Sequence, residues 1–427
     1  MRGAPRSSGG YYMENRTDFG ITREGIICFA GEDWWYHHPH SKYHILKRLA
    51  RQNRVIFVNS LTMGLPSMSN PDFFLKIRRK LKSYMRWLKK TPEGIWVMTP
   101  VALPFFGSAW MRRLNRILLN VQLRVAMRIC GIGRPIVWVA IPSAADVAES
   151  LRPKLIVYQV SDKYDANEDS ALSKDVIRQL HSRLISMAGA VLYSGRRLFD
   201  EAADVPHRVY LQQAVDYDHF AVPAADTAPE IASIPHPVLG YFGQMDFVMD
   251  SELMTEVARR RPDWHWVLIG LRYNTMQVAD GPNIHLLGAK PYAELPRYLK
   301  HFDLCVLPWN LGSSFTSYGS AIKVREYLAS GKPVVMAPLF EYLETPGLRF
   351  YKNRDADDFI AKVEDALAND TAADRELRQA QVQDCTWDVR AREVGTLMKK
   401  LIDGGKLGSG QCFDGRPEAA LDVFPQS

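Results

Sequence analysis

The stretch from residue 308 to residue 335 reads PWNLGSSFTSYGSAIKVREYLASGKPVV. Small and hydroxyl-bearing residues fill a loop from Gly312 to Ser320. The pattern then predicts a helix over 320–330 that ends at Gly331, followed by a buried strand over 332–337. This order is typical of parallel α/β domains, where ligands bind at the carboxyl ends of strands and beside helix N-termini.

The same alternation of apolar runs and helical patterns extends in both directions along the chain. Before residue 221, strands are expected at 25–30, 54–60, 94–100, 135–142, 154–160, 190–194 and 208–212, and helices at 41–51, 73–90, 109–130 and 172–188. After the Ala- and Pro-rich stretch 221–237, strands are expected at 238–243, 264–270, 283–288, 302–308, 332–337 and 348–352, and helices at 251–261, 292–300, 320–330, 356–368 and 373–384. Nearly continuous apolar strands are typical of parallel sheets that are covered on both faces. The sequence therefore predicts two doubly wound, Rossmann-like domains facing each other across a cleft.

Composition places the 427-residue chain among ordinary globular proteins, with 47% hydrophobic and 24% charged residues. Its 5 cysteines include no CxxC pair, which argues against a disulfide scaffold or a zinc knuckle. The sequence lacks an apolar run long enough to span a bilayer, and its start has no signal-peptide core. We therefore expect a cytoplasmic protein with a disordered leader (1–20) and a flexible tail (404–427).

Positive charge is concentrated between residues 71 and 130, where 13 basic residues face only Asp72 and Glu93. Within this region, 73–90 alternates cations with apolar residues at helical spacing. A basic amphipathic helix of this kind suits an anionic membrane surface, so we expect peripheral attachment at the inner face of the cell membrane. The alternatives are a helix that packs on its own domain, or nucleic-acid binding, for which no recognised motif is present.

The loop and helix of 312–330 suggest how an anionic ligand is held. Loop amides and the helix N-terminus can cradle a diphosphate, and Lys323 can add a point charge. Glu326 lies on the same face and can accept hydrogen bonds from two ribose hydroxyls. The alternative is an exposed Lys–Glu pair. No GxGxxG follows the first strand of either half, and P-loop and GxSxG motifs are lacking. Asp216 and Asp218 have the DxD spacing of some metal sites, but no other acidic cluster accompanies them, so we favour a turn that caps the interdomain linker.

KVREYLASGKPVV (323–335) is similar to the K-x-x-EYLA-x-GKPVV block of GT-B-fold, retaining, family-4-like bacterial glycosyltransferases that build cell-surface polysaccharides. Further segments resemble that family in the same order, over about residues 24 to 400: VYQVSDKYDA (157–166), LQQAVDYDHF (211–220), GYFGQMD (240–246) and NIHLLGAKPYAELPRYLKHFDLCVLPW (283–309). The resemblance implies an acceptor-binding domain (21–218), a nucleotide-sugar-binding domain (219–386) and a helix (387–403) that crosses back onto the first domain.

The resemblance also assigns expected roles. Glu326 matches the glutamate that binds the nucleotide ribose, Lys323 matches the lysine near the diphosphate, and Asp162 faces the transferred sugar. Two positions depart from the family pattern: Tyr318 stands where many members have a second glutamate, and Gln244 follows Gly243 where many have Arg.

Other loop residues complete the expected site. Further donor contacts are expected from Gly243, Gln244, Arg272, Thr316, Ser317 and Tyr318, and acceptor contacts from Trp34, His37, His38 and His40. Plainer alternatives are also open. The loop with Trp34 and the histidines would only cover the sheet end, Gly243 would be an ordinary turn glycine, and Asp162 would cap the next turn. Arg272, Thr316 and Ser317 would be solvated loop residues.

We therefore predict a metal-independent, retaining glycosyltransferase with Asp162 and Lys323 as its catalytic residues. It would need no cofactor beyond the nucleotide-diphosphate sugar, and would act on a glycan or lipid-linked acceptor in bacterial surface or exopolysaccharide synthesis. The alternatives are a GT-B-like nucleotide-sugar epimerase and an inactive glycosyltransferase-like scaffold.

Overall fold

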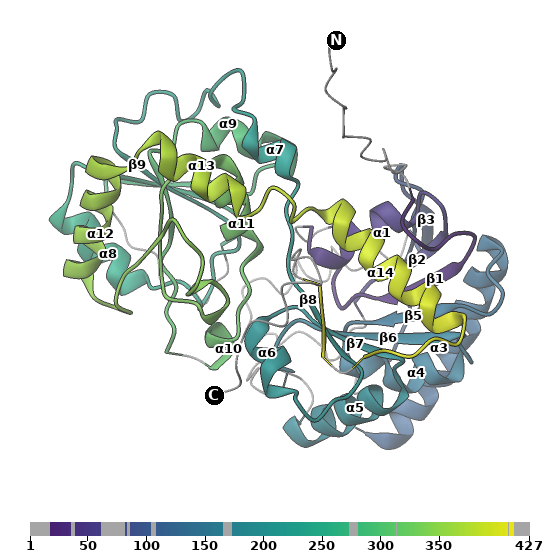
Figure 1. Cartoon of the computed structure of the whole chain (residues 1–427). Helices are drawn as coiled ribbons and strands as arrows, with labels where there is room; N and C mark the ends of the chain where they lie inside the picture. The colour runs from purple at the N-terminus through teal and green to yellow at the C-terminus, as the bar shows by residue number, and fades with distance from the viewer. Residues whose placement is uncertain are drawn as a thin grey trace, which may run out of the picture.

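The computed structural model describes residues 18–35, 39–60, 82, 86–103, 108–164, 173–272, 281–312, 314–408 and 410–413. These residues form two α/β domains, each built on one sheet with helices packed on both faces (Figure 1). The predicted fold class is confirmed.

The N-terminal sheet has the strand order β15-β8-β7-β6-β5-β1-β2-β4-β3, and every pairing is parallel except β3 with β4. Its strands are β1 (Gly25–Phe29), β2 (Arg54–Val58), β3 (Leu88–Lys90), β4 (Trp96–Met98), β5 (Ile136–Val139), β6 (Leu155–Val160), β7 (Ala190–Tyr193), β8 (Arg208–Leu211) and β15 (Gln411–Phe413). Ile26 and Cys28 of β1 enter one hydrophobic core, whereas Ile27 and Phe29 enter the other. Both faces are therefore buried, which explains the continuous apolar strands.

Helices cover the two faces of this sheet. α1 (Ser41–Leu49) and α14 (Trp387–Ile402) lie on one face, while α3 (Ala109–Cys130), η1 (Pro142–Ala144), α4 (Ala145–Ser150), α5 (Lys174–Met187) and α6 (Arg196–Glu201) belong to the other. None of the helices in the described part of the chain is long and apolar enough to cross a membrane.

The C-terminal sheet is wholly parallel, with the order β11-β10-β9-β12-β13-β14. Its strands are β9 (Val238–Phe242), β10 (His265–Ile269), β11 (Ile284–Gly288), β12 (Leu304–Leu307), β13 (Val334–Met336) and β14 (Leu348–Phe350). The helices are α7 (Tyr217–Ala221), α8 (Ser251–Arg260), η3 (Tyr292–Glu294), α9 (Leu295–Leu299), α10 (Ser314–Ser317), α11 (Ile322–Ser330), η4 (Phe340–Tyr342), α12 (Ala356–Asn369) and α13 (Ala372–Ala380). β9 lies between β10 and β12, so the strand order reverses there, and such a reversal opens a crevice at the carboxyl ends of the strands.

α14 carries the chain from the C-terminal domain back onto the N-terminal one, where it lies beside α1 (Figure 1). The rings of His44 and Trp387 stack with their centroids 4.8 Å apart. Arg48 Nη2 lies 2.9 Å from a carboxylate oxygen of Asp388. A Cβ at Gly395 would stand 1.8 Å from the Phe19 carbonyl oxygen, so this close approach requires glycine.

Three predicted segment boundaries differ from the structure. The predicted helix 73–90 is wrong at its end, because Leu88–Lys90 forms the strand β3, which pairs with β4. The turn between these two strands contains Gly94, whose φ is +86°. Most of the remaining segment lies outside the described residues. Phe19 was assigned to the leader, yet its side chain is fully buried. Gln411–Phe413 was assigned to the tail, yet it extends the first sheet as β15, because β8 otherwise leaves backbone groups unpaired at that edge.

Candidate active site between the domains

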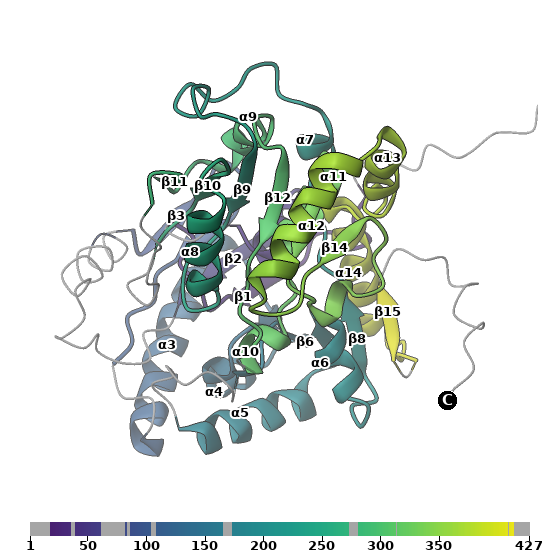
Figure 2. The same ribbon diagram turned by 90° about the vertical axis from the view of Figure 1, so that its left-hand side faces the viewer.

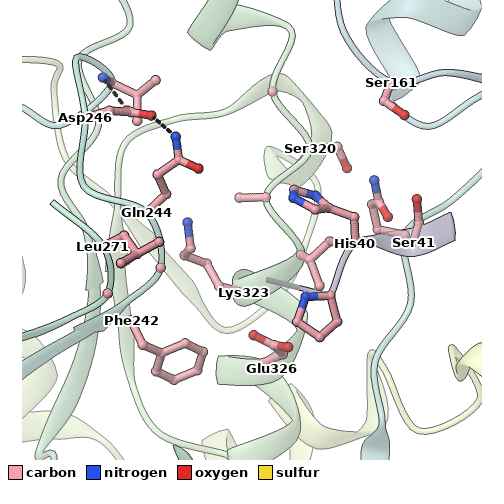
Figure 3. Close-up of a pocket in the computed structure, with 18 of the residues that line it drawn as sticks. His40, Ser41, Ser161, Phe242, Gln244, Asp246, Leu271, Ser320, Lys323 and Glu326 are labelled. Atoms are coloured by element: carbon pink, nitrogen blue, oxygen red, sulfur yellow. Dashed lines mark hydrogen bonds between the residues drawn. The ribbon is translucent and has the colours of Figure 1, made fainter. Parts of the chain in front are cut away.

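A cavity of about 440 Å³ lies between the carboxyl ends of the two sheets (Figure 3). The C-terminal domain contributes the loops after β9 and β10 and the first turns of α11. The N-terminal domain contributes the loop before α1 and the ends of β6 and β8. The cavity therefore has one wall from each domain.

The N-terminus of α11 forms the centre of the C-terminal wall. Ala321, Ile322 and Lys323 all line the cavity there, and within the described residues no side chain caps this end of the helix. The partial positive charge of the helix end therefore adds to the charge of Lys323. Lys323 Nζ donates to the Tyr241 hydroxyl at 3.2 Å and lies 5.0 Å from the centre of the Trp309 ring.

Gly243, at the end of β9, allows Lys323 to occupy this position. Its φ is +144°, a region that L side chains rarely adopt. A Cβ there would lie 2.3 Å from Cε and 2.6 Å from Nζ of Lys323. Any larger residue would therefore strain the turn and push the ammonium group out of place.

Glu326 lies one turn further along α11 and points into the same cavity (Figure 3). Its side chain is buried, and the residue is 6% exposed. Burial raises the pKa of Glu326 from 4.5 to about 7, although a hydrogen bond from the Tyr292 hydroxyl and the charge of Lys323 both act to lower it. Near neutral pH this carboxyl is thus able to exchange a proton.

A polar chain connects Glu326 to the first domain. The Tyr292 hydroxyl lies 3.4 Å from Asp216 Oδ2, and Asp216 in turn accepts a hydrogen bond from Arg48 at 2.7 Å. Burial opposes ionisation of Asp216, but His44 and Arg48 outweigh it and hold its pKa below its usual range. In the described part of the chain, no group of three His, Cys, Asp or Glu side chains is arranged to hold a metal ion.

The N-terminal wall carries a second charged group. Lys42 is 5% exposed and pairs with Glu32 at 2.7 Å. Burial would lower the pKa of Lys42, but the nearby Glu32 more than offsets it, so that pKa is raised. Asp162 lines the cavity just beyond the end of β6. Desolvation by the surrounding protein raises the pKa of its carboxyl, and the charge of Lys42 partly opposes that rise.

The structure brings part of the predicted site together. The predicted residues that line the cavity are His40, Asp162, Gly243, Gln244, Thr316, Lys323 and Glu326. Gln244 donates to Asp246 at 2.7 Å, and the Thr316 hydroxyl donates to the Asn310 carbonyl at 2.7 Å. The Thr316 hydroxyl is thus already used within its loop.

Other predicted residues lie elsewhere. Trp34 is outside the cavity lining and packs against Tyr43 and Phe57, with ring centroids 4.3 and 5.0 Å away, so it covers the sheet end. Arg272 is exposed and, like Ser317, does not line the cavity. His37 and His38 lie outside the described residues.

Tyr318 also lies outside the cavity lining and instead contacts the other domain. Its hydroxyl donates to Glu201 at 2.6 Å and accepts from Lys163 Nζ at 2.7 Å. Its ring lies 4.3 Å from the cationic groups of both Lys163 and Arg197. The side chain thus joins the loop before α11 to α6.

Several cavity residues were not named individually as site residues from the sequence: Glu32, Lys42, Gln213, Tyr292 and Trp309. Gln213 is 7% exposed, and its side-chain oxygen lacks a hydrogen-bond partner among the described residues, so it is available to a ligand. The sequence could have indicated Gln213, because it comes just after the strand β8 and ligands bind at the carboxyl ends of parallel strands.

Comparisons with known proteins agree with this arrangement. Residues 236–369 match the family described as Glycosyl transferases group 1, which covers most of the C-terminal domain. A protein of Bacillus subtilis (strain 168), TuaH, named provisionally as a glycosyltransferase of teichuronic acid biosynthesis, is 25% identical over 264 residues, covering 56% of this chain and 65% of TuaH. The chain thus spans slightly less than two thirds of that relative.

Solved structures show the same two-domain architecture. Sucrose-phosphate synthase from Thermosynechococcus elongatus superposes with a TM-score of 0.65 at 14% identity, covering 90% of this chain and 100% of that one. HepE of Anabaena, solved with UDP and glucose, gives a TM-score of 0.62 at 12% identity, covering 88% of this chain and 100% of that one. The chain has the GT-B fold.

Proposed function

We propose that this chain, with its GT-B fold and its match to the Glycosyl transferases group 1 family, is a glycosyltransferase that uses a nucleotide-diphosphate sugar. The transfer retains the anomeric configuration and needs no metal ion. The acceptor is a glycan or a lipid-linked glycan of bacterial surface or exopolysaccharide synthesis. The observation that carries the proposal is the pairing of Lys323 and Glu326 on the cavity face of α11.

The C-terminal wall suits the nucleotide. The α11 N-terminus and Lys323 attract the diphosphate, and ionised Glu326 accepts hydrogen bonds from the ribose hydroxyls. Phe242 and Leu295 supply apolar surface for the base beside them. Because HepE was solved with UDP and glucose, UDP sugars are the first donors to test.

The reaction breaks the bond between the anomeric carbon and the diphosphate oxygen, and the electron pair leaves with the diphosphate. Lys323 and the α11 amides stabilise that developing negative charge, which is the reason for proposing that no metal is required. The acceptor hydroxyl attacks from the same face and its proton passes to the leaving phosphate oxygen. Asp162, on the opposite wall, faces the transferred sugar and the incoming acceptor.

Membrane contact through 73–90 remains part of the proposal and rests on the sequence pattern, since most of that segment lies outside the described residues. Attachment there would hold the enzyme near a lipid-linked acceptor.

A thermal-shift screen tests the donor site. UDP, GDP, dTDP and their common sugar conjugates are compared on the native chain and on Glu326→Ala. A ligand at about 100 times its dissociation constant stabilises the fold by about 2.7 kcal/mol. One nucleotide family should raise the melting temperature of the native chain, and Glu326→Ala should abolish that rise. No shift with any nucleotide would favour a scaffold, and conversion of a nucleotide sugar without acceptor would favour an epimerase.

A further inference from the structure

The outer face of α3 exposes large apolar side chains along its whole length. Trp110 is 67% exposed, Ile117 54%, Val121 59%, Val125 46% and Ile129 56%. Leu114, at 38%, completes the row. Single exposed apolar residues are ordinary on a protein surface, but a continuous row on one helix marks an interaction site.

The row is a true helix face, which we call the α3 outer face (Trp110, Leu114, Ile117, Val121, Val125 and Ile129). At about 100° per residue its members cluster opposite Asn115, Leu119, Leu123 and Ala126, the side chains that face the domain core. α3 therefore has two apolar faces, and the domain buries only one of them. Figure 2 shows α3 along the lower left edge of the molecule, at the outside of the N-terminal domain.

Arginines flank the α3 outer face. Arg113, Arg124 and Arg128 are exposed. Near the start of the helix, Arg112, Arg113 and Arg116 line a hollow with Asp146. The helix itself contains no acidic residue, and none occurs between Glu93 and Asp146 in the sequence.

We propose that the α3 outer face docks onto an anionic lipid bilayer, with its apolar row at the acyl boundary and its arginines on the phosphate headgroups. An apolar stripe bordered by arginines suits such a surface in both polarity and charge. A second copy fits less well, because pairing two α3 helices would bring arginines together with no acid on either helix to balance them.

This surface is distinct from the segment 73–90, and docking does not depend on the proposed transfer reaction. Both regions belong to the N-terminal domain, the acceptor side of the cavity. Docking through α3 would therefore bring the N-terminal wall towards lipid-linked molecules while the C-terminal domain remains accessible to soluble donors.

Vesicle flotation of the full chain tests the proposal. Phosphatidylcholine vesicles are compared with vesicles containing about 30% phosphatidylglycerol. The native chain should bind the anionic vesicles, and the double variant Ile117→Gln/Val121→Gln should bind about a hundredfold more weakly, since two half-inserted apolar side chains are lost. The pair Arg113→Gln/Arg124→Gln should weaken binding about thirtyfold at low salt and much less at high salt.

The matched control is Val222→Gln/Leu377→Gln, which removes apolar side chains that are 64% and 41% exposed in the C-terminal domain. This control should bind vesicles like the native chain. All variants should keep the native melting temperature, because exposed substitutions change stability by about 0.5 kcal/mol or less.

Three results would overturn the proposal. The native chain does not bind anionic vesicles; Ile117→Gln/Val121→Gln binds them as well as the native chain does; or that variant loses self-association of the chain while it still binds vesicles. Arg78→Gln/Arg79→Gln measures the contribution of 73–90 separately. Nucleotide-sugar binding, followed in solution, should be unchanged in every α3 variant, so failure of docking and failure of the donor site are told apart.

Discussion

Donor affinity should rise with pH because the cavity carboxyl of Glu326 must ionise to accept ribose hydroxyls. With a pKa raised to about 7, Glu326 is ionised in about one tenth of the molecules one pH unit below that value and in about nine tenths one unit above. If only the ionised form binds well, affinity for a nucleotide sugar should increase about tenfold from about pH 6 to about pH 8.

Isothermal titration calorimetry with the nucleotide sugar found in the thermal-shift screen measures this dependence. The sugar conjugate is preferred over the free diphosphate, whose terminal phosphate titrates in the same range. Glu326→Gln should bind weakly with a flat pH profile. His40 also lines the cavity, so His40→Gln serves as the control and should keep the native profile.

The pH dependence of the free energy of unfolding is an independent check, because stability should fall as pH rises whereas donor affinity should increase. The carboxyl of Glu326 ionises at 4.5 when unfolded and at about 7 when folded. The fold therefore loses stability as pH rises between these values, by about 3 kcal/mol when ionisation is complete. Glu326→Gln should unfold at higher denaturant concentration than the native chain at about pH 8. A pH-dependent affinity that persists in Glu326→Gln, or a flat native profile, would refute the reasoning.

Further substitutions separate the parts of the site. Gly243→Ala should displace Lys323, weaken donor binding at least about tenfold and lower the stability of the fold by about 1–3 kcal/mol. The control Gly133→Ala, where an added Cβ has no neighbour within 4 Å, should change neither donor affinity nor stability. Calorimetry measures the affinity, and denaturant unfolding measures the stability. Lys323→Ala should lower the turnover rate about a hundredfold or more in steady-state assays while the fold is retained, and native turnover would exclude it from leaving-group stabilisation. Tyr318→Phe removes the hydroxyl that bonds Glu201 and should cost about 1.5–3 kcal/mol of stability with donor affinity within about twofold of native; a large loss of donor affinity would return Tyr318 to the donor site.

Local patterns predicted most of the helices and strands. The expected helix 109–130 has the bounds of α3, because its core-facing residues recur at helical spacing from Asn115 to Cys130. The paired positions of Lys323 and Glu326 on one face of α11 follow from the i,i+3 relation alone. The segment at 88–90 was mispredicted, since a short strand formed by pairing with β4 leaves no periodic signal of its own.

The sequence by itself therefore determined the order of the helices and strands, their buried faces and the position of Lys323 and Glu326 on one face of α11. These features depend on the periods of two residues in strands and 3.6 residues in helices. Only the tertiary structure decided which loops face the cavity. Glu326 meets Tyr292 and, through it, Asp216, while Lys42 meets Glu32 on the opposite wall. Tyr318 contacts Glu201 of the other domain instead of lining the expected donor site, because the direction of a loop depends on the surface on which it packs. Such contacts join residues far apart in the chain, and their geometry exists only once the two domains have packed together.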